Sequence, residues 1–138
     1  MISTAEWQVM RTVWTNKTVT ATQVHTLLSK EFEWSMSTIK TLLSRLVKKG
    51  YLTHEKQQRE FVYRSCIDEM DVILQKQQEL LALVCTTKHG ELFERLLANA
   101  TLSKTDAQQM IALLTKRLDT LDETVTCCCA KGQCICHV

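Results

Sequence analysis

The sequence predicts a mostly α-helical protein with one small β-hairpin, and three observations support this fold class. The 138 residues include three glycines and no proline, so extended structure with many tight turns is not expected. Apolar residues recur at helical spacing along most of the chain, and a hydrophobic content of 45% is enough for a packed core. Only residues 51–64 change to short β-prone runs.

Three short helices are predicted before Gly50. The first begins at a capping box, STAE at residues 3–6, in which the Ser3 hydroxyl accepts from the amide of residue 6 and Glu6 bonds back to the amide of Ser3. A second capping box, TATQ at residues 20–23, begins the second helix. Ser35 or Ser37 caps the third helix, which ends at Gly50 as its C′ residue.

A hairpin follows these helices. The runs YLTHEK at 51–56 and EFVYR at 60–64 flank the polar residues 57–59, as in two paired strands. Three helices and a two-stranded hairpin, with a turn between the second and third helices, have the order of a winged helix-turn-helix domain whose hairpin is the wing. We therefore expect a winged-helix DNA-binding domain at residues 1–66.

Residues 67–124 are expected to form a helical dimerisation region. Apolar stripes run from residue 70 to 84 and from 92 to 97, and the pattern SKTD at 103–106 caps a last amphipathic helix. These helices have too few residues to bury their stripes within one chain, so pairing with a second copy into a homodimer is the economical solution. The alternative is that they pack on the first domain.

The charge distribution favours a polyanionic partner for the first half of the chain. Residues 1–65 carry ten lysines and arginines against five acidic residues, whereas residues 66–138 carry seven against ten. A basic first half suits DNA and an acidic second half suits a protein partner, although a solvated surface also shows such a pattern. Without a leader-like start or a run of about 18 apolar residues, we expect a soluble, cytoplasmic protein with no membrane partner.

The third predicted helix has one face of hydroxyls and cations without a carboxylate, which suits the major groove of double-stranded DNA. Residues near the start of a recognition helix reach base edges, whereas cations near its end and in the wing contact phosphates. An ordinary exposed helix is the alternative. The predicted DNA-contacting residues are Ser37, Thr38, Lys40 and Thr41 for bases or phosphate positioning, Arg45 for either role, and Lys48, Lys49 and Arg59 for phosphates.

The C-terminal residues 125–138, here called the hook, carry the pattern CxCxxxxCxC. Five of the seven cysteines lie between residues 127 and 136, which in a cytoplasmic chain favours metal or redox chemistry over structural disulfides. With Gly132 allowing the backbone to reverse, Cys127, Cys129, Cys134 and Cys136 are predicted to form a four-thiolate site. A redox-active dithiol cluster or an unstructured tail are the alternatives.

The site is expected to hold one Zn(II) or two Cu(I) ions. Four thiolates with either load keep a formal charge of −2, so exchange has to be signalled by geometry, because zinc prefers a tetrahedron and Cu(I) accepts two or three sulfurs. Cys128 and His137 are treated as bystanders. Cys66 and Cys85 are expected to be small buried hydrophobic residues.

The chain resembles the BlaI/MecI/CopY family of winged-helix repressors, and the hook is similar to that of the copper-responsive CopY branch. The stretches that carry the resemblance are ISTAEWQVM at 2–10 with Trp14, STIKTLLSRLVKKG at 37–50, and Tyr63. The resemblance implies a homodimer on an inverted repeat with a TACA and TGTA core, which represses copper-export genes until Cu(I) displaces Zn(II). A copper chaperone is the implied metal donor.

Two other control mechanisms and one other function class compete with this reading. Relatives that respond to β-lactams are cleaved at an Asn-Phe bond, whereas residues 97–101 here read LANAT, which speaks against relief by proteolysis. Relief by thiol oxidation stays open, and a copper-buffering protein would not need the carboxylate-free helix face. The sequence has no glycine-rich phosphate loop and no nucleophile with a nearby base, so an enzyme is not expected.

Overall fold

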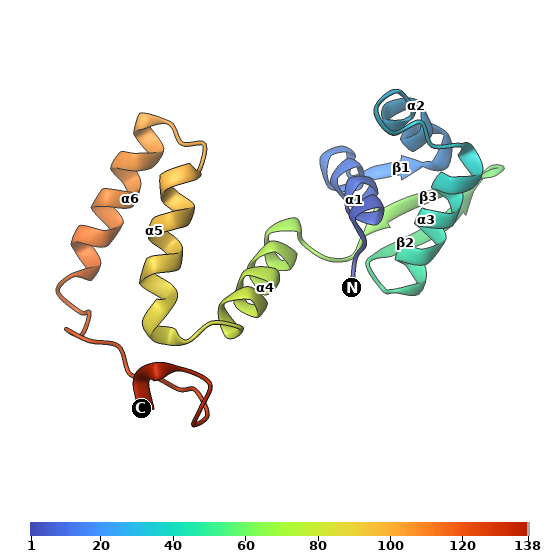
Figure 1. Ribbon diagram of the computed structural model, residues 1–138. Coiled ribbons are helices and arrows are strands. Elements are labelled where there is room, and N and C mark those ends of the chain that lie inside the picture. Colours follow the sequence, from blue (N-terminus) through green and yellow to red (C-terminus); the bar gives the residue numbers. More distant parts are fainter. Residues whose placement is uncertain (138) are drawn as a thin grey trace. The chain divides into compact units, whose positions relative to one another are not determined.

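The computed structural model describes the backbone of residues 1–137 and the side chains of residues 1–136. It confirms a mostly helical chain with a small antiparallel sheet (Figure 1). The chain divides into two compact units, Met1–Gln75 and Lys76–Val138, which we call the winged-helix unit and the C-terminal unit. The boundary falls within α4 (Glu69–Ala82), and the division at residues 66/67 and 124/125 stays a prediction.

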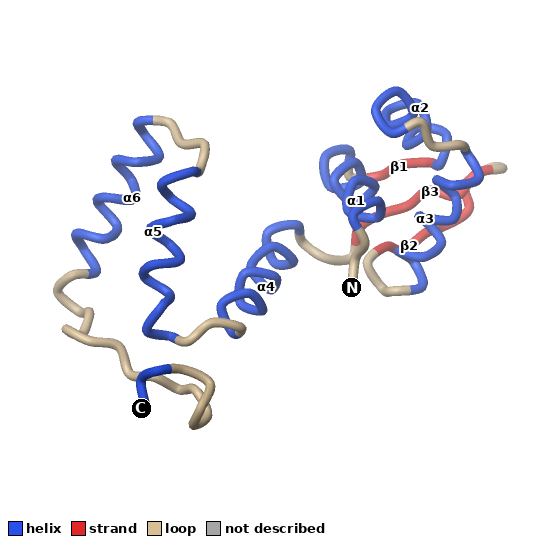
Figure 2. Tube along the Cα trace, viewed as in Figure 1, coloured by secondary structure: helices blue, strands red, loops and turns tan. Residues whose placement is uncertain are grey.

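The winged-helix unit contains the three predicted helices and the predicted hairpin. Its elements are α1 (Thr4–Asn16), β1 (Thr18–Thr20), α2 (Ala21–Phe32), α3 (Met36–Lys48), β2 (Leu52–Gln57), β3 (Glu60–Ser65) and the start of α4. The strand order is β1-β3-β2, all antiparallel, with Val19 of β1 opposite Tyr63 of β3 (Figure 2). Sequence analysis missed β1, because its run of three residues is too short to show a period of two.

Helix ends are fixed mainly as the caps predict. Thr20 and Gln23 form both bonds of the capping box of α2. Ser35, not Ser37, caps α3 by accepting from the amide of Thr38 at 3.1 Å. Gly50 follows the last residue of the helix cap with φ of 87°, a left-handed conformation that glycine adopts without strain, so its role as C′ residue is confirmed.

The capping box predicted for α1 forms only in part. Ser3 accepts from the amide of Glu6 at 3.1 Å, as expected. The Glu6 carboxylate instead accepts from the ammonium group of Lys49, at 2.8 and 2.9 Å. A partner 43 residues along the chain therefore replaces the local bond, and sequence spacing gives no sign of it.

The core of this unit is shared by the helices and the sheet, and it positions α3. The fully buried side chains are Val9, Met10, Val13, Val19, Val24, Ile39, Leu43, Leu46 and Leu52. Val72 of α4, 5% exposed, belongs to the same cluster. Since α3 buries Ile39, Leu43 and Leu46, the opposite face of this helix is left to solvent.

The C-terminal unit contains the rest of α4, the 3-10 turns η1 (Thr86–Lys88) and η2 (Ile135–His137), and the helices α5 (His89–Asn99) and α6 (Lys104–Arg117). Ser103 and Asp106 form both bonds of the predicted capping box of α6. Within the described chain, α5 and α6 bury no residue, although both carry apolar stripes. No helix among the described residues has the length and apolar character needed to cross a bilayer.

Candidate nucleic-acid interface and thiolate cluster

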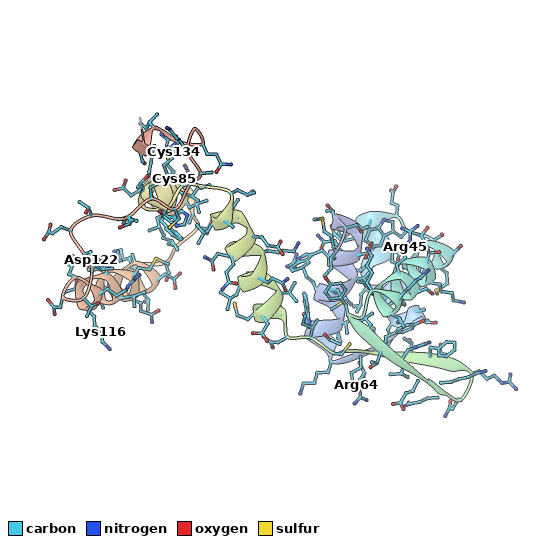
Figure 3. All side chains as sticks on the ribbon, turned by 90° about the horizontal axis from the view of Figure 1, so that it is seen from below. Arg45, Arg64, Cys85, Lys116, Asp122 and Cys134 are labelled. Atoms are coloured by element: carbon cyan, nitrogen blue, oxygen red, sulfur yellow. The ribbon has the colours of Figure 1, made fainter. Side chains whose placement is uncertain are left out.

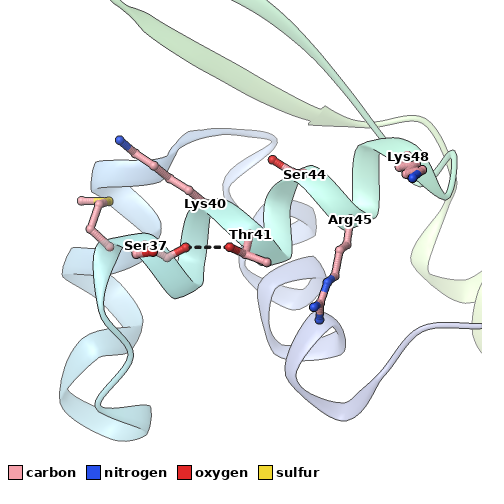
Figure 4. A pocket seen from close by; sticks show the side chains of 7 residues that line it. Ser37, Lys40, Thr41, Ser44, Arg45 and Lys48 are labelled. Atoms are coloured by element: carbon pink, nitrogen blue, oxygen red, sulfur yellow. Dashed lines mark hydrogen bonds between the residues drawn. The ribbon is translucent and has the colours of Figure 1, made fainter.

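The exposed face of α3 forms an open groove that gathers most of the predicted DNA-contacting residues. Its lining contains no carboxylate (Figure 4) and consists of Met36, Ser37, Lys40, Thr41, Ser44, Arg45 and Lys48. The Thr41 hydroxyl donates to the Ser37 carbonyl at 3.0 Å. Lys40, Arg45 and Lys48 form no ion pair with an acidic residue in the described structure. The groove can offer hydroxyls and positive charge to a polyanion.

Three predicted DNA-contacting residues lie outside this groove. The Thr38 hydroxyl is 3.0 Å from that of Ser35, at the N-terminal end of α3. Arg59 is exposed in the turn between β2 and β3, at the tip of the wing. The Lys49 ammonium group is bound by the Glu6 carboxylate and also donates to the Met1 carbonyl at 2.8 Å.

The Lys49–Glu6 ion pair has a structural place in the fold. The Glu6 side chain is 3% exposed and that of Lys49 is 35% exposed. Burial raises the pKa of Glu6, but hydrogen bonds from Lys49 and Ser3, with the positive charges of Lys49 and Arg45, lower it more, so the net pKa lies below its usual value. The carboxylate is thus held ionised by a cation that the sequence analysis assigned to DNA.

Four cysteine sulfurs meet in the C-terminal unit, and we call Cys85, Cys127, Cys129 and Cys134 the thiolate cluster. Their Sγ atoms all lie within 4.8 Å of one another. Figure 3 labels two of them, Cys85 and Cys134, next to each other. Cys127 Sγ is 3.3 Å from Cys134 Sγ and 3.5 Å from Cys85 Sγ. Three of the four predicted ligands are therefore brought together.

The fourth predicted ligand, Cys136, lies at the edge of the cluster. Its Sγ atom is 3.9 Å from Cys85 Sγ and 3.6 Å from the Thr87 hydroxyl. Cys136 as a metal ligand stays a prediction. Cys85 is half-buried, with its Sγ atom against the Thr87 hydroxyl and Cys127 Sγ, so the expectation that it is a small buried hydrophobic residue was wrong. The same expectation was wrong for Cys66, which is exposed and donates to the Gly50 carbonyl at 3.1 Å.

The backbone brings the hook back on itself and onto the turn after α4. Gly132, at φ 91°, reverses the chain as predicted, and the turn is closed by the Gln133 amide donating to the Ala130 carbonyl at 3.1 Å. The Thr86 hydroxyl donates to the Thr126 carbonyl at 2.7 Å, which ties η1 to the start of the hook. These bonds hold the two segments of the thiolate cluster together.

The cysteines of the thiolate cluster differ in pKa. Hydrogen bonds from the Thr87 hydroxyl and amide lower the pKa of Cys85 to about 6. Bonding to the Cys136 amide and the Cys127 thiol lowers the pKa of Cys134. The Cys129 amide lowers the pKa of Cys127, but burial and the neighbouring thiols of Cys134 and Cys85 raise it more, and the net shift is upward. Since a metal binds the thiolate form, a cation bound at Cys127 would release the proton of this thiol.

The donor set fits a soft metal ion. Zinc bound by four thiolates has Zn–S distances of about 2.3 Å, which places the sulfurs of a tetrahedron about 3.8 Å apart. The sulfur separations here, from 3.3 Å up to 4.8 Å, bracket that value. Cu(I) also accepts such sulfurs in a compact cluster with bridging thiolates. Cys85, Cys127, Cys129 and Cys134 could hold either ion.

Comparison with known proteins adds the family. Residues 2–116 match the penicillinase repressor family. An uncharacterised 16.5 kDa protein of Latilactobacillus sakei is 40% identical over 136 residues, covering 99% of this chain and 93% of that protein. The penicillinase repressor of Bacillus licheniformis is 36% identical over 113 residues, covering 82% and 88%.

Two solved repressor structures are similar in sequence to about half of this chain. The solution structure of the DNA-binding domain of the repressor BlaI is 46% identical, with a TM-score of 0.48 over 51% of this chain and 87% of that chain. The CopR repressor structure is 43% identical, with a TM-score of 0.43 over 49% and 99%. Because the family match spans most of the sequence, the chain belongs to the penicillinase repressor family of DNA-binding transcriptional repressors and is not an enzyme.

Proposed function

We propose that the chain is a copper-responsive repressor that works in the cytoplasm. With zinc in its thiolate site it binds inverted-repeat operator DNA as a homodimer, and Cu(I) releases it by replacing Zn(II), which derepresses copper-export genes. The observation that carries the proposal is the convergence of four cysteine sulfurs within 4.8 Å in a family of repressors. A thiolate set of this kind selects zinc and Cu(I) over harder ions.

For DNA binding, α3 is the recognition helix. Ser37, Thr38, Lys40 and Thr41 stand at its N-terminal half and read bases or position phosphates, as expected where a recognition helix enters the major groove. Arg45 and Lys48 in the same groove, with Arg59 on the wing, contribute phosphate contacts. Lys49 is left out of this set because its ammonium group is bound by Glu6.

Dimerisation covers the apolar surface of α5 and α6. Phe93, Leu96, Ile111 and Leu114 are between 44% and 65% exposed, and exposed apolar side chains in such numbers usually mark a protein contact. A symmetric dimer presents two recognition helices related by a two-fold axis, which matches the two half-sites of an inverted repeat.

Metal exchange is the signal. Four thiolates around one Zn(II) or two Cu(I) keep a formal charge of −2, so the two states differ in the positions of the sulfurs rather than in charge. Zinc requires a tetrahedral set, whereas Cu(I) draws two or three sulfurs to each ion. A copper chaperone is a suitable donor, because it passes Cu(I) between thiolates without releasing free ions.

Thiol oxidation is the second candidate signal, and one distance favours it. Cys127 Sγ and Cys134 Sγ are 3.3 Å apart, and a disulfide of about 2.05 Å would form when the two thiols give up two protons and two electrons to an oxidant. The lowered pKa of Cys134 favours its thiolate form, which suits the attacking sulfur in such chemistry.

The test is fluorescence anisotropy of a labelled inverted-repeat duplex with the zinc-loaded protein, under reducing conditions, with Cu(I) titrated into the complex. We expect tight binding that Cu(I) abolishes, and no copper response after Cys127, Cys129 and Cys134 are changed to serine. DNA binding that is unaffected by Cu(I) but lost with a mild oxidant would favour thiol oxidation as the signal. DNA binding that neither Cu(I) nor the oxidant changes would favour proteolysis as the signal. Absence of specific DNA binding would favour a metal-storage protein.

A further inference from the structure

Cys85 lies outside the hook, in the turn between α4 and η1. It is 42 residues from Cys127 in sequence, yet its Sγ atom is 3.5 Å from Cys127 Sγ and 3.9 Å from Cys136 Sγ. Among the described residues it is the member of the thiolate cluster that the CxCxxxxCxC pattern does not contain. The position of Cys85 therefore indicates that the metal site can include a residue from outside the hook.

We propose that Cys85 is a metal ligand, and that it completes a tetrahedral zinc site with Cys127, Cys129 and Cys134. The bound ion then ties the hook to the connector that follows α4. This inference rests on the metal-responsive function proposed above and names a ligand that the hook pattern omits.

Two features support the assignment besides the sulfur distances. The Thr86 hydroxyl bond to the Thr126 carbonyl, 2.7 Å long, holds the residue after Cys85 against the residue before Cys127. The connector itself is fixed, because the His89 imidazole bonds the carbonyls of Leu81 and Val84 at 2.9 and 3.1 Å and so caps the end of α4. Cys85 therefore lies in a turn that hydrogen bonds hold in place.

A tetrahedral ion binds four sulfurs, whereas five cysteines lie at this site. In the proposed zinc site Cys136 is the cysteine that does not coordinate. It stands 3.9 Å from Cys85 and is exposed, so it can enter when the coordination changes. If Cu(I) instead binds the four hook sulfurs, Cys85 is no longer a ligand, and the metal no longer connects the hook to the segment that follows α4. Zinc and copper then differ in whether the connector is held.

The first experiment measures thiol protection in the wild-type protein. Tryptic cleavage places Cys85 alone in peptide 77–88, Cys66 alone in peptide 65–76, and the hook cysteines in peptides 118–131 and 132–138. Pulse alkylation of the metal-free and zinc-loaded protein is followed by mass spectrometry. We expect zinc to slow alkylation of peptide 77–88 at least about tenfold, together with the hook, and to leave Cys66 unchanged. An unchanged rate at Cys85 overturns the proposal.

The second experiment separates ligation from mere shielding. Cys85→Ser, Cys136→Ser and the control Cys66→Ser are loaded with Co(II), and their charge-transfer spectra and competition with Zn(II) are recorded. Because Cys136 can take a vacated position, the effect of Cys85→Ser is read in the Cys136→Ser background. There it should remove about a quarter of the sulfur-to-cobalt intensity, as one of four thiolates is lost, and lower zinc affinity at least about tenfold. Cys66→Ser should match the wild type. A wild-type spectrum for Cys85→Ser with a collapsed one for Cys136→Ser refutes Cys85 as ligand.

These readouts do not depend on repression. If zinc protects Cys85 but the anisotropy assay shows no response to Cu(I), the ligand assignment stands and the copper-responsive function fails. If Cu(I) releases the DNA but zinc leaves Cys85 reactive, the function stands and the site is the hook alone. Far-UV circular dichroism of each variant checks that α4 is intact.

Discussion

Replacing Lys49 by methionine is expected to destabilise the winged-helix unit by about 2–3 kcal/mol and to leave operator affinity nearly unchanged. The Lys49 ammonium group donates to both carboxylate oxygens of Glu6 and to the Met1 carbonyl, at 2.8 to 2.9 Å. Removing one partner of a buried ion pair costs about 3–5 kcal/mol. Water reaches the Lys49 side chain, which is 35% exposed, so we discount that range.

The loss depends on pH in a defined direction. In the wild type the pKa of Glu6 lies below its usual value, so the pair stabilises the fold above about pH 4.3, and this contribution is lost as the pH falls through the folded pKa. In Lys49→Met, burial remains without the lysine, and the pKa of Glu6 rises. The protonated carboxyl then tolerates burial, so the difference in stability between the two proteins is largest near neutral pH and shrinks as the pH falls toward the lowered pKa of Glu6 in the wild type.

Urea unfolding followed by tryptophan fluorescence measures this unit, because all three tryptophans lie in Met1–Gln75. Lys48→Met is the matched control: Lys48 lines the α3 groove and makes no ion pair in the described structure. It should keep wild-type stability and lose operator affinity, the reverse of Lys49→Met. Equal stability of the two variants, or a pH-independent difference, would show that the pair does not stabilise the fold.

Four further substitutions test the other surfaces. Lys40→Ala and Arg45→Ala should each weaken operator binding and, where a phosphate contact is lost, reduce the slope of log affinity against log salt by about 0.9; unchanged affinity would remove that residue from the interface. Leu114, 50% exposed on α6, becomes a charge in Leu114→Glu, which should yield monomers in light scattering, and a surviving dimer would place the interface elsewhere. Thr86→Val removes the 2.7 Å bond to the Thr126 carbonyl, worth about 1 kcal/mol, and should lower zinc affinity about fivefold in a chelator competition; equal affinity would mean that the bond does not hold the hook.

Local signals predicted most of the helical framework. Capping residues and apolar periodicity placed α2, α3 and α6, because both act within a few residues of each other. The choice between Ser35 and Ser37 as cap of α3 stayed open, since either hydroxyl can reach an amide three residues on. The strand β1 was missed because Thr18–Thr20 forms it only by pairing with β3, which lies far along the chain.

The candidate site was predictable only where its pattern is local. The Cys-x-Cys pairs and Gly132 indicated the hook, whereas Cys85 joins it through a tertiary contact that no spacing encodes. A usable signal was present nonetheless. Cys85 begins a polar turn, CTTK at 85–88, that directly follows an apolar helix, and a cysteine at such a position is unlike a buried one. Lys49 illustrates the opposite case, a cation on a basic stretch whose partner is inside the fold.

A four-thiolate site has the same formal charge with one Zn(II) as with two Cu(I), so the signal depends on which cysteines bind each metal. If all four ligands belonged to the hook, exchanging zinc for copper would rearrange a segment joined to the rest of the chain only at its own start. With Cys85 among the zinc ligands, the exchange changes the restraint on the end of α4. The first turns of that helix carry Val72, which is 5% exposed and belongs to the core that positions α3. Since α4 begins near Val72 and ends shortly before Cys85 in the sequence, we expect loss of Cys85 to uncouple operator binding from copper while leaving α3 and its groove unaltered.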